Sequence, residues 1–156
     1  MNEAMIEPDG THAITVVRDF DHPVAKVFRA MSESELVAQW MGPRYLTNVE
    51  STSDLRHGGT WTLVQRDSDG NEHRFRGVLH GDPTPELSQR TFEWLGMPGH
   101  VSFETMRLED LGDGRTRSRQ VSVFTSVNDR DGMLSSGMEA GVHESFERLD
   151  ELLADL

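Results

Sequence analysis

Residues 126–156 carry the longest amphipathic pattern in the chain. Placed at about 100° per residue, their apolar side chains fall on one continuous arc, and the charged side chains fill the remainder. Ser126 and Asp129 have the spacing of a capping box, and an acidic residue suits the positive end of a helix dipole. The pattern predicts one long C-terminal helix, so the rest of the chain must cover its apolar side.

The apolar side of this helix is uneven along its length. Its C-terminal end carries large aliphatic side chains, namely Leu149, Leu152, Leu153 and Leu156. Its first half carries small or flexible ones, namely Met138, Gly141, Val142 and Ser145. We therefore expect the helix to be clamped at its C-terminal end, with a cavity beneath its first half.

The preceding residues alternate between strand-like segments and turns. Residues 12–20 predict a first strand, and two short helices follow, the second opened by a capping box of Ser32 and Glu35. Turn residues such as Asp69 and Gly70 separate the later segments. Six further strands are predicted at residues 45–52, 60–66, 72–80, 88–95, 101–108 and 115–124.

A long helix and a large antiparallel sheet can hide their apolar faces together if the sheet curves around the helix. We therefore expect an α+β fold in which a curved antiparallel sheet of seven strands wraps the C-terminal helix. The two short helices lie between strands 1 and 2 and close one end. Residues 11–156 are expected to form this single domain, and residues 1–10 a loose N-terminal arm.

Composition narrows the classes of partner. The formal charge of −12 repels nucleic-acid phosphates and anionic membrane surfaces, so neither partner is expected. No segment approaches the roughly 20 apolar residues that span a bilayer, and residues 1–10 lack a secretory-signal profile, which predicts a cytoplasmic protein. The chain contains no cysteine, and its seven histidines show no metal-ligand spacing. We therefore expect neither a metal nor another cofactor.

Four segments resemble the START-like superfamily, also called helix-grip or SRPBCC. They are HPVAKVFRAMSESELVAQWMGP (22–43), HGGTWTLVQRDSDGNEHRFRGV (57–78), TFEWLGMPGH (91–100) and DRDGMLSSGMEAGVHESFERLDELL (129–153). Within it, the chain is most similar to the branch named for homology to the activator of a heat-shock ATPase. The resemblance implies the helix-grip fold. Members of the superfamily bind lipids and other hydrophobic ligands, cyclise polyketides, or have no assigned role.

Strand alternation indicates which side chains face the predicted cavity. If strand arginines such as Arg76 and Arg119 face water, the alternate residues face the helix. These include Gln65, Gln120 and Ser122. Aromatic side chains provide the large, rigid surface that an apolar ligand needs. The predicted ligand-binding residues are Trp40, Trp61, Gln65, Phe75, Phe92, Trp94, Gln120, Met138, Gly141, Val142 and Ser145.

The leading interpretation is non-enzymatic binding of a small hydrophobic or amphipathic molecule in this cavity. An enzyme of cyclase or hydrolase type is the alternative, with His80, Glu93 or Tyr45 as acid–base groups. A third interpretation is a chaperone-associated interaction domain with a role in the stress response, because the branch name suggests one. A homodimer is compatible with each of them.

Two glutamates separate the binding interpretation from the enzyme. A hairpin centred on residues 98–99 would place Glu93 directly opposite Glu104, and like charges in that position are destabilising. We expect both carboxylates on the outer face, accessible to solvent and within about 4 Å of an arginine. That arrangement turns neighbouring aromatic residues such as Phe103 inward. Two carboxylates buried beneath the helix would instead favour acid–base chemistry.

Overall fold

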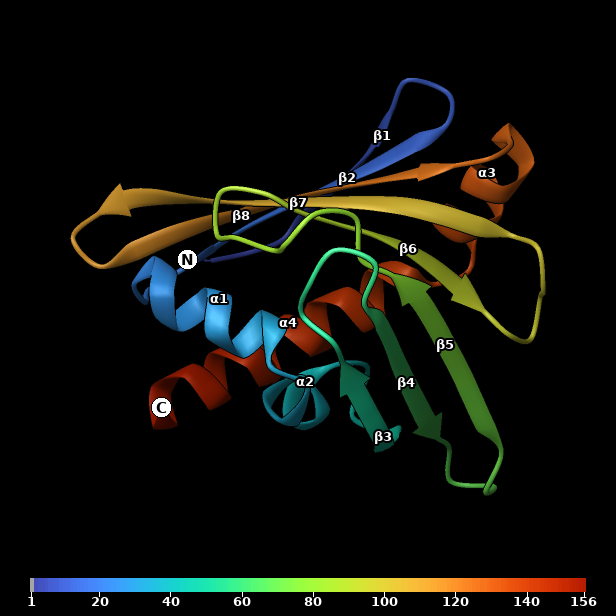
Figure 1. Ribbon diagram of the computed structural model, residues 1–156, viewed down its shortest axis with the longest axis horizontal. Helices are drawn as coiled ribbons and strands as arrows, with labels where there is room; N and C mark the ends of the chain where they lie inside the picture. The colour runs from blue at the N-terminus through green and yellow to red at the C-terminus, as the bar shows by residue number, and fades with distance from the viewer. Residues whose placement is uncertain (1) are drawn as a thin grey trace.

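Residues 2–156, the part of the chain described by the computed structural model, form one antiparallel sheet of eight strands with four helices (Figure 1). In chain order the elements are β1 (Met5–Asp9), β2 (Ala13–Phe20), α1 (Val24–Ser32), α2 (Ser34–Trp40), β3 (Thr47–Ser53), β4 (Thr60–Arg66), β5 (Glu72–Val78), β6 (Ser88–Trp94), β7 (Val101–Gly112), β8 (Arg115–Phe124), α3 (Val127–Ser135) and α4 (Met138–Asp155). Across the sheet the order is β1-β2-β8-β7-β6-β5-β4-β3. The sheet curves around α4, so the predicted fold class is confirmed.

The sheet has one strand more than predicted. Met5–Asp9 was expected in a loose arm, but it forms β1 and pairs antiparallel with β2, from Met5 opposite Val17 to Asp9 opposite Ala13. Gly10, with φ of 59°, turns the chain between the two strands. The strand was missed because Glu7, Pro8 and Asp9 disfavour strands on their own. Pairing with β2 outweighs that local preference.

The predicted single C-terminal helix is wrong in one respect, because it is broken into α3 and α4. Gly137 lies between them in the left-handed region, with φ of 84° and ψ of 16°. Glycine occupies this region without the steric penalty that a Cβ brings. The predicted start is confirmed, since the Asp129 N–H donates to the Ser126 hydroxyl oxygen at 3.0 Å. The break lets α3 and α4 take different directions over the sheet (Figure 1).

The two short helices follow β2, as predicted, but the capping box between them is wrong. Ser32 is the last residue of α1, and Glu33, the N-cap of α2, makes no side-chain capping hydrogen bond. At the end of α2 the Trp40 indole N–H donates to the carbonyl oxygen of Ala30 at 2.9 Å. This bond ties α2 back onto α1, so the two helices form one block at one end of the concave face.

The C-terminal half of α4 is buried against this block, as the leucine pattern predicts. Leu149 and Leu153 are 0% exposed and belong to a core cluster with Phe20, Val27 and Trp40. The main apolar core therefore lies at one end of the sheet, and the first half of α4 lies over a different part of the concave face (Figure 1).

Within residues 2–156, no helix is both long and apolar enough to cross a bilayer.

An ion pair between a buried arginine and a partly exposed aspartate also joins α4 to the sheet. Arg18 of β2, whose side chain is only 5% exposed, donates to both carboxylate oxygens of Asp150 at 2.9 and 2.6 Å. Its guanidinium carbon lies 4.8 Å from the centroid of the Phe20 ring. Arg18 faces inward together with Ile14 and Phe20 of the same strand, contrary to the expectation that strand arginines face water. This bidentate pair links the C-terminal half of α4 to β2.

Candidate functional site

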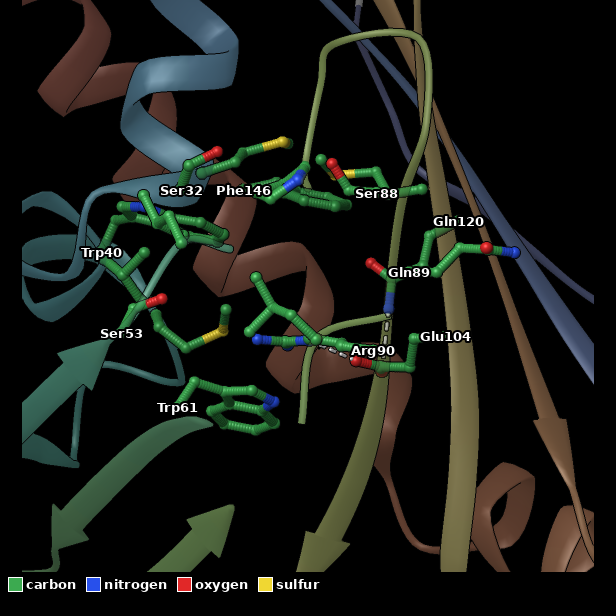
Figure 2. A pocket seen from close by; sticks show the side chains of 17 residues that line it. Ser32, Trp40, Ser53, Trp61, Ser88, Gln89, Arg90, Glu104, Gln120 and Phe146 are labelled. Carbon is green, nitrogen blue, oxygen red and sulfur yellow. Dashed lines mark hydrogen bonds and ion pairs between the residues drawn. The ribbon is translucent and has the colours of Figure 1, made fainter. Parts of the chain in front are cut away.

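A cavity of about 330 Å³ lies between the concave face of the sheet and the first half of α4. A second volume of about 130 Å³ adjoins it under α1 and α2, and Trp40, Trp61 and Phe146 line both (Figure 2). The larger volume is at the lower end of the range for ligand pockets, about 300–1,000 Å³. Apolar side chains make up most of the lining, so the cavity suits a small hydrophobic molecule.

The structure brings most of the predicted binding residues together around this cavity. Trp40, Trp61, Phe92, Gln120, Met138, Gly141, Val142 and Ser145 line it. The small side chains of α4 do leave space, because a Cβ added to Gly141 would meet only the Pro43 side chain, at 3.9 Å. The Ser145 hydroxyl is already used, since it accepts the Gly42 N–H at 2.8 Å. That these residues bind a ligand stays a prediction.

Three of the predicted residues lie outside the cavity lining. Gln65 is buried, and its amide donates to the Asn48 side chain at 3.1 Å, which satisfies it within the protein. Phe75 lies behind the lining and packs on Phe92, with ring centroids 5.4 Å apart. Trp94 is 37% exposed and lies beside His73, farther along β6. Sequence alternation identified their face of the sheet but not the position of the cavity along it.

Trp61 is held across a gap in the β5–β6 ladder. The paired residues stop at Phe75–Trp94 and Arg76–Glu93, and a single bridge follows at Leu79–Arg90. In the gap, the Trp61 indole N–H donates to the Thr91 carbonyl oxygen at 3.1 Å, and the Val78 N–H donates to the Thr91 hydroxyl oxygen at 2.9 Å. The indole can reach across because residue 77 is a glycine: a Cβ there would overlap the Thr91 carbonyl oxygen and crowd the indole nitrogen.

Replacing Gly77 with alanine is therefore expected to lower the free energy of unfolding by about 1–3 kcal/mol, the usual range for overpacking a tight site. Chemical denaturation followed by tryptophan fluorescence measures this change. Gly132→Ala on α3 is the matched control, because a Cβ there meets nothing within 4 Å. It should be neutral or slightly stabilising. Equal stability of the two variants would contradict the close approach at Gly77.

A polar row crosses the cavity wall, and sequence reasoning identified only two of its four residues. Arg90 on β6 lies directly opposite Glu104 on β7, and Glu104 lies opposite Ser122 on β8. The Glu104 carboxylate accepts the Arg90 Nε–H at 2.9 Å, the Gln120 amide at 3.0 Å and the Ser122 hydroxyl at 3.5 Å. Alternation did place Gln120 and Ser122 inside. The Arg90–Glu104 pair gave no such signal, because it depends on strand register.

The expected pairing of Glu93 with Glu104 is wrong. Glu93 lies opposite Val101, because the hairpin is shifted by three positions from one centred on residues 98–99. A shift by an odd number turns the side chains of β7 to the other face relative to β6. Glu93 therefore stays outside with Arg76 at 3.1 Å, whereas Glu104 faces the cavity and Phe103 faces outward. Each glutamate has the expected arginine, but neither is well exposed, at 12% and 13%.

The three acid–base groups considered for an enzyme, Tyr45, His80 and Glu93, do not line the cavity. Tyr45 is 69% exposed, and His80 packs against the Phe103 ring at 5.5 Å. The Gly99 N–H, followed by Arg76, lowers the pKa of Glu93 below its ordinary value, which keeps this carboxylate ionised rather than suited to donate a proton. The same residues contain no cluster of three or more potential ligands for a metal ion.

Solved structures with the same fold include a protein from Rhodobacter sphaeroides, with a TM-score of 0.92 and 20% identity over 99% of each chain. Another, from Arthrobacter aurescens, has a TM-score of 0.84 and 24% identity over 97% of this chain and 92% of the other. A comparison with curated proteins finds no match. The family model for activator of Hsp90 ATPase homolog 1-like proteins matches residues 21–154. Since this match spans nearly the whole domain, the chain belongs to that family, within the START-like superfamily.

Proposed function

We propose that the protein binds one small hydrophobic or amphipathic molecule in the cavity beneath the first half of α4. The observation that carries the proposal is the cavity itself, about 330 Å³, with a mostly apolar lining crossed by one polar row. Such a combination buries an apolar body while a few polar groups fix its orientation. Membership of the START-like superfamily, some of whose members bind lipids and other hydrophobic ligands, supports the same assignment.

Binding without chemistry is favoured over a cyclase or hydrolase by the state of the polar groups. The Glu104 carboxylate, which faces the cavity, already accepts three hydrogen bonds from protein side chains. A carboxylate with three such partners is held in place, and a substrate proton would have to displace one of them. A homodimer and a chaperone-related partner stay predictions of the sequence.

The uncharged fluorophore N-phenyl-1-naphthylamine tests the proposal, because its emission rises in apolar surroundings. We expect saturable binding with one molecule per chain and a Kd on the order of micromolar, as for other compounds of this size in apolar pockets. Fluorescence titration gives the Kd, and calorimetry gives the stoichiometry. An emission change that is absent, or that rises without saturation, would contradict a defined cavity site.

A further inference from the structure

We propose that the ligand is an uncharged molecule whose carbonyl oxygen, or an equivalent acceptor, binds the outer N–H groups of Arg90. This inference rests on the proposed function, since it assigns the chemical class of the molecule in the same cavity. The polar row of Arg90, Glu104, Gln120 and Ser122 supplies the recognition element, and the apolar lining supplies the rest of the site.

Arg90 is held rigidly and presents unused donors to the cavity. Its guanidinium carbon lies 4.0 Å from the centroid of the Trp61 ring, and its Nε–H donates to Glu104 at 2.9 Å. Within residues 2–156 these contacts leave the two terminal Nη groups without a protein acceptor, and Figure 2 shows them extending over Trp61 into the cavity. The Arg90 side chain is 35% exposed, so these N–H groups are open to the cavity, and a bound acceptor forms charge-assisted hydrogen bonds with them there.

Glu104 has the opposite role in the row. Arg90, Gln120 and Ser122 each donate to its carboxylate, so a ligand donor would have to compete with protein groups. The Trp61 ring is held by its hydrogen bond to the Thr91 carbonyl oxygen. The Arg90 guanidinium therefore has a fixed ring on one face and the Glu104 carboxylate at its Nε–H. A preorganised donor loses little conformational entropy when it binds. The row therefore selects an acceptor rather than a donor.

Charge balance argues for an uncharged ligand. Among the residues that line either volume, Arg90 and Glu104 are the charged ones, so the wall is neutral overall. A carboxylate ligand would satisfy Arg90, but it would bring a second negative charge close to Glu104 without compensation in a partly desolvated site. A ketone, ester or amide oxygen uses the free N–H groups and adds no charge.

Three naphthalene compounds of similar shape test this inference by displacement of N-phenyl-1-naphthylamine: 2-acetylnaphthalene, 2-ethylnaphthalene and 2-naphthoate. In the wild type we expect the ketone to bind more tightly than the carboxylate. The ratio of the Kd of the ethyl compound to that of the ketone should fall by about tenfold in R90M/E104M, which removes both charges together. The double change avoids leaving the Glu104 carboxylate without its arginine partner. An unchanged ratio, or tighter binding of naphthoate than of the ketone, would overturn the inference.

A measurement on the wild type alone gives a second test. Infrared spectra of 2-acetylnaphthalene labelled with ¹³C at the carbonyl report whether its oxygen accepts a hydrogen bond. We expect the bound carbonyl band to lie below its position in hexane, and a hexane-like position would overturn the inference. Failure of the proposed function gives a different result, because N-phenyl-1-naphthylamine would then not bind the wild type at all.

Discussion

Gly141→Leu is expected to weaken binding of N-phenyl-1-naphthylamine by about tenfold or more while the fold stays intact. Residue 141 lies on the inner side of α4, and a Cβ there makes only an ordinary contact with Pro43, so the leucine side chain enters the cavity. Leucine is also a better helix former than glycine, by about 1 kcal/mol, so thermal stability should be kept or raised. Fluorescence titration and thermal unfolding measure the two effects.

Gly132→Leu provides the matched control on the neighbouring helix. Residue 132 is exposed on α3, a Cβ there meets nothing within 4 Å, and the residue is not part of the cavity lining. This variant should bind the fluorophore as the wild type does. Loss of stability in Gly141→Leu would mean that residue 141 is needed for close packing, and unchanged binding in a folded Gly141→Leu would place the ligand elsewhere.

Leu149→Ala is expected to lower the free energy of unfolding by about 2–5 kcal/mol, the range found for truncation of buried leucines. Leu149 is 0% exposed and packs in the cluster that joins α4 to α1, α2 and the sheet. The lost methyl groups leave a void that these rigid elements cannot close fully. Denaturant unfolding followed by circular dichroism measures the change.

Leu156→Ala is the control for this prediction, because Leu156 is 40% exposed at the end of α4. It should change the free energy of unfolding by less than about 0.5 kcal/mol, as surface substitutions usually do. A loss below that value for Leu149→Ala as well would mean that the C-terminal half of α4 contributes little to holding the sheet. The binding prediction would then need a different account of how the cavity is kept open.

Much of the fold could be predicted from local patterns. The alternation of residues predicted β4 and β8 with the boundaries that the structure shows, and the capping pair at Ser126 predicted the start of α3. The contrast between leucines and small residues on the C-terminal segment predicted which half of α4 is buried tightly. These features depend on period, side-chain size and capping, which a single segment carries by itself.

Other features depended on contacts between distant segments. β1 forms because its backbone can pair with the edge of β2, although its own residues are poor strand formers. The break at Gly137 was not evident, because the apolar arc continues through it and a glycine is also tolerated inside a helix. Arg18 faces inward because Asp150, far along the chain, meets it there. In each case the partner supplies the free energy that the local sequence lacks.

The polar row of the cavity shows most clearly what only the tertiary structure decided. Alternation along β8 was enough to predict that Gln120 faces inward, because successive side chains of one strand point to opposite faces of the sheet. The meeting of Arg90 with Glu104 required the register between β6 and β7, and a shift of three positions moved Glu104 from the outer face to the cavity wall. Register follows from the turn and from packing of the whole sheet on α4, and neither can be evaluated from one strand alone.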